Sequence, residues 1–365
     1  MRGTEKMDFE LGDDLELVVE TARKLAESEL TPRVRESEAS RAVSEELLGS
    51  WEEIGLADLE VPEAAGGAGL GAVARVLVNE ELAAGDAGAA LALDPYGPAL
   101  TAILEVAGED AASEFVASLS RRPARALLIM GEDARVDLVS DQISIDAPWV
   151  AADKADVIVV LNGDEAILLR EGFTLERVRG AGLRAAGASS LQASSAPIAA
   201  RWSNPEGAAR ARSRARLYYA SLLIGVMRAA CEFSAAYSQE REAFGKPIGH
   251  HQALAFLIAE MRIAVDAARL LVHEAAWRVD AGLPSAVEAS SAWAECIDVS
   301  RTVGPDAVQI LGGHGFMADY PVEKFMREAR ALGLLCGGFD AAIEEAGRDL
   351  VNSTHPLSLT THGAN

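Results

Sequence analysis

The first third of the chain places its hydrophobic residues at helical spacing. Near its start, the apolar positions share one face of a helix: Leu15, Val18, Val19, Ala22 and Leu25. This spacing predicts an amphipathic helix, and a second helix is predicted over 45–54 with Ser44 as its N-cap. The Pro- and Gly-rich passage at 61–71 predicts an ordered loop. A helix over 72–84, with two more before residue 121, completes this part.

The spacing of the apolar residues changes in the middle of the chain. Short β-branched or apolar runs follow one another between breaks of Gly, Asp, Asn and Pro: ARALLIMG, QISIDAPWVAA, ADVIVVLNG, AILLREG and LQASSAPIA. Such punctuation is typical of strands, and several strands in a stretch this short indicate a small sheet or barrel.

Helical spacing then returns and is sustained. Apolar residues step by three and four at Leu217, Ala220, Ile224, Met227 and Cys231, and by seven at Phe256, Ile263, Leu270 and Trp277. These repeats predict helices packed along their length, as in a four-helix bundle. KPIG at 246–249 and AGLPS at 281–285 separate the helices, and Gly304-Pro305 is expected to start, end or kink one.

The order of these patterns predicts an α+β fold that is mostly α. We expect an N-terminal helical domain over 1–121, a central β-domain over 122–204 and a C-terminal four-helix bundle with a tail over 205–365. A chain of 365 residues exceeds the usual limit of roughly 250–300 residues for one core, so several packed units are expected.

Charge narrows the possible functions. The 33 Lys and Arg residues against 56 Asp and Glu give a formal charge of −23. An acidic surface repels phosphate, which argues against a nucleic-acid binder and requires a locally positive pocket for any anionic cofactor. No apolar run reaches the ~20 residues of a membrane span. The polar start MRGTEKMDFELGDD lacks the apolar stretch of a secretory signal, so we expect a cytoplasmic protein.

The sequence predicts neither a disulfide framework nor a metal site. Cys231, Cys296 and Cys336 are odd in number and scattered. Their spacing matches no metal-ligand pattern, and no Glu-x-x-His pair of the kind found in di-iron bundles occurs.

Two segments carry candidate chemistry. REAFGKPIGHHQ at 241–252 combines a cation, a glycine-shaped turn and the start of a helix, which together suit a phosphate group. QILGGHGFMADYPVEKFMREAR at 309–330 contains glycines that let backbone approach a ligand closely. Taken singly, the first is also compatible with an ordinary helix connection and the second with a helix C-cap and turn.

Taken together, these segments resemble the acyl-CoA dehydrogenase family. The resemblance extends to WEEIGLADLEVPEAAGGAGL at 51–70, NEELA at 79–83 and EMRIAVDAARLLVHEAAWRVD at 260–280, and so covers most of the chain. It implies an N-terminal helical domain, a central β-domain and a C-terminal four-helix bundle.

The resemblance also implies a cofactor and a reaction. Family members use FAD to remove two hydrogens across the α–β bond of an acyl-CoA thioester, while a glutamate takes the α-proton. In the family, residues of the bundle reach FAD held mostly by a neighbouring subunit. The matching positions here are Arg241, Phe244, Gln252, Gln309, Gly312 and Gly313. Arg241 is expected to face the pyrophosphate, and Trp149 to pack either beside the flavin ring or in the core at the rim of the sheet.

The position of the family glutamate departs from the pattern. Counting from Arg327 places Cys336 there, and a slip of one residue places Gly337 there. Some relatives carry the glutamate on the helix before the 241–252 turn, where this chain has Ala215. Nothing in the sequence marks Cys336 as an activated thiolate, so an inert buried cysteine is favoured.

The β-domain departs as well. LLIMGEDARVD at 127–137 stands where relatives carry T-E-P-x-x-G-S-D, and Trp149, Val150 and Ala151 stand where they carry W-I-T. The half of the flavin site that the bundle supplies is therefore retained in sequence, and the half that the β-domain supplies is altered.

This asymmetry leads to a functional hypothesis with two alternatives. The chain is interpreted as a subunit that completes a partner's FAD site in a homo- or hetero-tetramer, similar to two-subunit bacterial members acting on steroid side chains. The alternatives are an independently active dehydrogenase with an unrecognised base, and a flavin-free scaffold of the same fold. The sequence leaves open the acyl chain, which could be a fatty acid or a steroid side chain, the partner and the electron acceptor.

Overall fold

The N-terminal part of the molecule is helical. The structure, a computed structural model, describes residues 10–119 and 125–352. Its first helices are α1 (Asp13–Leu25), α2 (Thr31–Ser40), α3 (Glu45–Ile54), α4 (Ala72–Leu93), α5 (Gly97–Ala107) and α6 (Glu109–Ser118). A π-helical turn, Ala26–Leu30, joins α1 to α2. The helices predicted here are confirmed.

Local chemistry explains the start and end of α3. The Ser44 hydroxyl accepts a hydrogen bond from the backbone N–H of Leu47 at 3.2 Å, which caps the helix as predicted. Gly55 follows the last residue with φ of 76°, a left-handed conformation that suits glycine.

Helix α4 is broken close to the predicted end at residue 84. Asp86 has non-helical backbone angles (φ −161°, ψ 107°), and a second helical segment that the sequence did not predict follows it to Leu93. The Asp86 carboxylate accepts a hydrogen bond from the N–H of Ala89 at 3.0 Å, so it caps the second half of the helix.

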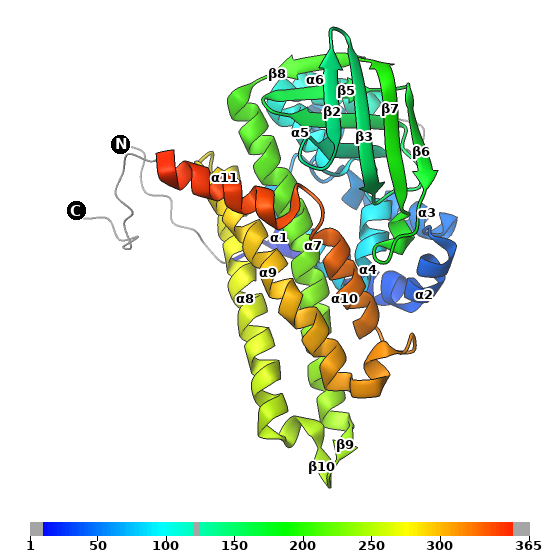
Figure 1. Cartoon of the computed structure of the whole chain (residues 1–365), viewed down its shortest axis with the longest axis vertical. Coiled ribbons are helices and arrows are strands. Elements are labelled where there is room, and N and C mark those ends of the chain that lie inside the picture. The colour runs from blue at the N-terminus through cyan, green and yellow to red at the C-terminus, as the bar shows by residue number, and fades with distance from the viewer. Residues whose placement is uncertain (1–9, 120–124, 353–365) are drawn as a thin grey trace, which may run out of the picture.

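The middle of the chain forms two four-stranded sheets, at the top of the view in Figure 1. The first has the order β1 (Ala126–Met130), β4 (Val157–Asn162), β5 (Glu165–Leu169) and β8 (Ala200–Ser203). The second has the order β2 (Arg135–Val139), β3 (Gln142–Val150), β7 (Ser189–Pro197) and β6 (Phe173–Arg177). Only the β1–β4 pairing is parallel among these described strands. The predicted β unit is confirmed, but β2, β6 and β8 carry no continuous apolar run and escaped the sequence analysis.

The C-terminal part is a bundle of long helices. They are α7 (Pro205–Glu240), α8 (Gln252–Asp280), α9 (Ala286–Leu311), α10 (Val322–Leu332) and α11 (Gly338–Asn352). A small hairpin, β9 (Glu242–Ala243) and β10 (Lys246–Pro247), joins α7 to α8 at the end of the bundle away from the sheets (Figure 1). No helix in the described ranges combines the length and apolar character needed to cross a membrane.

Gly304-Pro305 lies inside a helix. The sequence predicted a start, an end or a kink there, but α9 neither starts nor ends near Pro305. A proline inside a helix removes one backbone hydrogen bond. Packing of α9 against α7, α8, α10 and α11 holds the helix across this position.

The seven-residue repeat on α8 does not mark the core of the bundle. Phe256, Ile263 and Leu270 are 57%, 68% and 54% exposed, so the prediction that they pack within the bundle is wrong for this chain alone. The face that packs inward consists of smaller residues: Met261, Val265, Ala268, Val272, Ala275, Ala276 and Val279. We call Phe256, Ile263 and Leu270 the α8 stripe. An apolar stripe on a helix surface is a feature of interaction sites.

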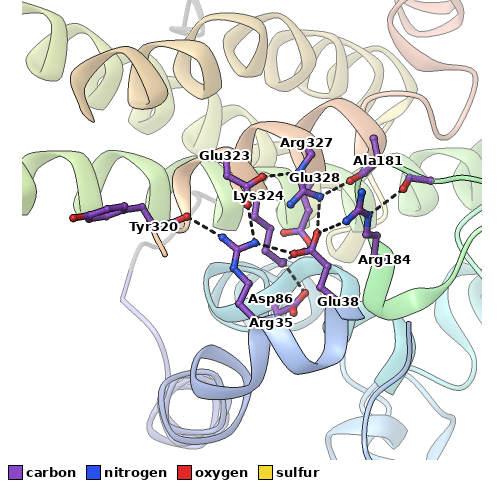
Figure 2. Close-up of polar contacts among 11 residues, drawn as sticks. Arg35, Glu38, Asp86, Ala181, Arg184, Tyr320, Glu323, Lys324, Arg327 and Glu328 are labelled. Atoms are coloured by element: carbon purple, nitrogen blue, oxygen red, sulfur yellow. Dashed lines mark hydrogen bonds and ion pairs between the residues drawn. The ribbon is translucent and has the colours of Figure 1, made fainter. Parts of the chain in front are cut away.

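A buried ion cluster joins α4 to α10 (Figure 2). The Lys324 ammonium lies 3.1 Å from the Asp86 carboxylate and 2.5 Å from the Glu328 carboxylate, and all three residues are 1% exposed. Burial by itself would lower the pKa of Lys324, but attraction to Glu328 and Asp86 raises it. Burial raises the pKa of Glu328 to about 7 against the opposing charge of Lys324.

A second layer of ion pairs surrounds this cluster on the side of α2 (Figure 2). Glu38 lies 2.6 Å from Arg327 and 2.8 Å from Arg35, and Arg35 also lies 2.7 Å from Glu323. These contacts join α2 to α10. The position of α10 matters because the segment 333–337 follows it directly.

Replacing Lys324 with Met should destabilise the protein strongly. The variant leaves two buried carboxylates without a cation, so we expect a loss of about 3–5 kcal/mol in the free energy of unfolding, measured by urea denaturation. The matched control is Arg348→Ala, which removes an exposed pair with Glu344 at 3.0 Å. That control should cost less than about 1 kcal/mol. Similar losses in the two variants would contradict the role given to the cluster.

Candidate functional site

A cavity of about 330 Å³ lies where the three parts of the chain meet. Strands β1 and β3 supply one wall, and Tyr218 and Tyr219 of α7 supply another. The end of α4 and the segment 333–337 close the remaining sides. We call this space the interdomain cavity. Its volume is at the small end of the roughly 300–1,000 Å³ typical of ligand sites.

Trp149 and the neighbours of Cys336 line the interdomain cavity. Trp149 lies on β3 and is half-buried. Leu335 and Gly337 border the cavity, while Cys336 between them is 1% exposed with φ of 54°. Burial raises the pKa of the Cys336 thiol well above its usual value. The thiol is therefore protonated at neutral pH, which favours the inert interpretation of this cysteine.

The other candidate position for a base lies in a structural ion network. Ala215 on α7 is fully buried. Its neighbour Arg214 lies 2.8 Å from Glu60, and its other neighbour Arg216 donates to the Ser290 hydroxyl at 2.6 Å. These contacts hold α7 against the rest of the chain.

Asp133 is a cavity residue that the sequence analysis missed. It lies in the turn between β1 and β2, where one carboxylate oxygen accepts from the N–H of Cys336 at 3.0 Å and the other from that of Gly337 at 2.5 Å. Burial raises the pKa of Asp133 to about 6, against the opposing effect of these two hydrogen bonds. An acidic pair, Glu132 and Asp133, directly after a buried strand was the available signal.

Asp94 also lines the interdomain cavity, and its carboxylate is held by hydrogen bonds and an ion pair. Its carboxylate accepts from the Tyr218 hydroxyl at 2.9 Å and from the N–H groups of Tyr96 and Gly97, and it lies 3.5 Å from Arg75. Burial and the Asp94 charge raise the pKa of Tyr218 well above its usual value, so its phenol stays neutral.

Three predicted cofactor residues lie in or beside the β9–β10 hairpin, which is at the end of the bundle away from the sheets (Figure 1). Arg241 follows the last residue of α7, and Gln252 is the first residue of α8; both are exposed. Phe244, at the tip of the β9–β10 hairpin, is 95% exposed with φ of 55°. The N–H of Ile248 donates to the Arg241 carbonyl at 2.8 Å and closes the turn. Among the described residues, the Arg241 guanidinium has neither an ion pair nor a hydrogen bond.

The other three lie where α9 ends. Gln309, Gly312 and Gly313 are exposed, and Gly312 caps the helix with φ of 59°. The Tyr237 hydroxyl lies 2.7 Å from Nδ1 of His314 and ties this segment to the last turn of α7. The structure therefore keeps these six residues in the bundle and does not bring them to Trp149 within one chain.

Metal ligation finds no support in the part of the chain that the structure describes. No group of three or more His, Cys, Asp or Glu side chains there is arranged to hold a metal ion.

Known proteins resemble the chain along most of its length. A probable acyl-CoA dehydrogenase of Mycobacterium tuberculosis is 28% identical over 358 residues, which cover 88% of this chain and 91% of that protein. Benzylmalonyl-CoA dehydrogenase of Aromatoleum aromaticum is 28% identical over 355 residues, with 89% and 94% covered.

Solved structures share the fold. Butyryl-CoA dehydrogenase of Megasphaera elsdenii has a TM-score of 0.82 at 24% identity, and the match covers 95% of this chain and all of that one. The FAD complex of PigA has a TM-score of 0.81 at 19% identity and covers 94% of this chain and 99% of that one.

Family models match both helical parts of the chain. The acyl-CoA dehydrogenase N-terminal domain matches residues 12–121, and the acyl-CoA dehydrogenase C-terminal domain matches residues 208–347. These two ranges together span more than half of the sequence and carry the same assignment as the relatives. The chain belongs to the acyl-CoA dehydrogenase family.

Proposed function

We propose that this chain is a subunit of an FAD-linked acyl-CoA dehydrogenase that completes the FAD site of a partner subunit and lacks the family glutamate. The observation that carries the proposal is the separation of the site residues. Arg241 and Gln252 flank the β9–β10 hairpin, which lies at the end of the bundle away from the sheets (Figure 1), whereas strands β1 and β3 of the sheets line the interdomain cavity. A single chain cannot use both for one cofactor, whereas two chains side by side can.

The surface at the end of the bundle fits the diphosphate of FAD. The Arg241 guanidinium is exposed and has no acidic partner among the described residues, so it is free to bind an anion. A Cβ atom placed on Gly312 or Gly313 would meet nothing within 4 Å, which leaves the backbone open to close approach. When bound, FAD supplies the acceptor for the hydride that leaves the β-carbon.

The α8 stripe supports an assembly of subunits. Phe256, Ile263 and Leu270 expose apolar surface along one side of α8, and Phe244 exposes more at its start. Burying such surface against another subunit is favourable. We propose a homo- or hetero-tetramer in which a second acyl-CoA dehydrogenase chain covers this side.

Loss of the base explains why a partner is needed. Cys336 is buried and protonated, and Ala215 has no acidic group. A missing general base typically lowers a rate by about 10²–10⁴. The catalytic glutamate is proposed to belong to the partner.

One observation favours a second candidate function. Asp133 is a carboxylate at the edge of the interdomain cavity and contacts the segment that bears Cys336. A carboxyl group whose pKa is raised to about 6 is suited to act as a base near neutral pH. In this alternative the chain is an independently active dehydrogenase with Asp133 as its base.

The two candidates differ in where flavin is found. Purified alone, the chain should lack the visible absorption of stoichiometric FAD. Co-produced with a catalytic acyl-CoA dehydrogenase subunit that carries the family glutamate, it should yield a mixed complex that contains FAD. A flavin band in the isolated chain that an acyl-CoA bleaches would refute the partner-subunit proposal.

Replacing Arg241 with Ala should weaken FAD retention in the mixed complex. Removing a hydrogen-bonding cation from a diphosphate costs about 1.5–3 kcal/mol, or roughly 10- to 100-fold in affinity, measured as FAD remaining after gel filtration. Arg262→Ala is the matched control, because Arg262 is an exposed bundle arginine paired with Asp266 at 2.8 Å. Equal retention in the two variants would contradict the role given to Arg241.

Replacing Asp133 with Asn distinguishes the candidates by activity. If the partner supplies the base, turnover of the mixed complex should change by less than about tenfold. A base must be ionised, so a catalytic Asp133 would give a rate that rises as the pH passes about 6. If Asp133→Asn removes this rise of the rate with pH and lowers the turnover rate by about 10²–10⁴, the second candidate is established. Asp137→Asn, at an exposed position on β2 that does not line the interdomain cavity, is the control.

A further inference from the structure

Arg125 is a buried cation without a counter-ion. It directly precedes β1 and is 9% exposed. One Nη donates to the carbonyl of Ala151 at 3.2 Å, while its Nε is buried with no hydrogen-bond partner. No carboxylate of the described residues lies within ion-pair distance of its guanidinium. Burial lowers the pKa of Arg125, with only partial compensation from Tyr218 and Asp94.

Other buried arginines of the chain are paired. Arg75 lies 2.7 Å from Glu60, and Arg216 lies 2.5 Å from Glu345. A buried charge costs much free energy unless it is paired and hydrogen-bonded. Arg125 differs from these arginines because no carboxylate of the described residues pairs with its guanidinium; its one side-chain hydrogen bond is to the Ala151 carbonyl.

The guanidinium of Arg125 belongs to the interdomain cavity. Ala151, which accepts its hydrogen bond, lines this cavity. The groups whose charges act on Arg125 are Tyr218, Asp94 and Tyr219, and all three line the same cavity. Arg125 also borders a second cavity of about 280 Å³, but none of these four residues lines it.

Tyr219 provides a second unused donor in the interdomain cavity. The residue is 9% exposed, and its hydroxyl has no hydrogen bond to any described residue. The charge of Arg125 acts on it, which indicates that the two groups are neighbours. Tyr218 differs from Tyr219 in that its hydroxyl donates to Asp94 at 2.9 Å.

Two of the three acidic residues that line the cavity, Asp94 and Asp133, are already hydrogen-bonded within the chain; the third, Glu132, is exposed. Asp94 is held by Tyr218, Arg75 and two backbone N–H groups. Asp133 is held by the N–H groups of Cys336 and Gly337. Arg125 and Tyr219 both keep donors that no described residue uses, and both lie at this cavity.

We propose that the interdomain cavity binds an acyl group that carries an oxygen acceptor beyond its thioester, and that Arg125 and Tyr219 donate to this oxygen. The inference rests on the proposed function for the acyl-CoA nature of the ligand. The acceptor is a carboxylate or a carbonyl oxygen, which share the ability to accept from both donors. A site with unpaired buried donors rejects an analogue that lacks the acceptor.

Three five-carbon probes test the inference: pentanoyl-CoA, 4-oxopentanoyl-CoA and glutaryl-CoA. Binding to the mixed complex is measured by isothermal titration calorimetry. We expect at least one oxygen-bearing probe to bind about tenfold or more tightly than pentanoyl-CoA, the ratio expected for a hydrogen bond to a charged group. The keto probe tests a carbonyl acceptor and glutaryl-CoA tests a carboxylate. Equal binding of all three, or tighter binding of pentanoyl-CoA, would overturn the inference.

Two variants test whether Arg125 and Tyr219 cause the tighter binding of an oxygen-bearing probe over pentanoyl-CoA. Arg125→Met should abolish this preference, and Tyr219→Phe should reduce it while keeping the ring in place. A preference that survives both substitutions would overturn the inference. If Arg125→Met does not fold, Tyr219→Phe decides alone, because it removes only one hydroxyl. FAD content is measured on the same samples, so a complex that holds FAD but shows no preference refutes the inference and leaves the proposed function standing.

Discussion

The buried ion cluster of Asp86, Lys324 and Glu328 is the contact on which the interior of the molecule depends. Removing one partner of a buried ion cluster is strongly destabilising, so the ammonium fixes α4 and α10 relative to each other. Asp86 also starts the second half of α4, which ends beside the interdomain cavity. α10 leads into the segment 333–337 on another side of that cavity. One cation therefore positions two of its walls.

The two halves of the family's site differ in how they are built. At the end of the bundle, Arg241 and Phe244 project outward and make few contacts within the chain. Around the interdomain cavity, Asp133, Asp94 and Tyr218 are held by several hydrogen bonds each or by burial. This difference supports the proposed function. The outward surface at the end of the bundle can contact FAD bound to a neighbouring subunit, whereas the enclosed cavity can bind only a ligand that enters it.

Sequence patterns predicted the local structure and missed what depends on distant contacts. The cap at Ser44 and the strands β1, β4 and β5 of the first sheet follow from neighbouring residues alone. The pairing of Asp133 with Cys336 joins positions 203 residues apart, and no local pattern encodes it. The α8 stripe shows a second limit, since a seven-residue repeat indicates that a helix is covered but not by which chain.

The α8 stripe has a consequence for how the protein must be made. A chain released from the ribosome without its assembly partner would present Phe256, Ile263 and Leu270 to water. Exposed apolar surface of this kind promotes aggregation, and chains without a partner become substrates for proteolysis. Matched synthesis of the chain and its assembly partner would keep this helix covered.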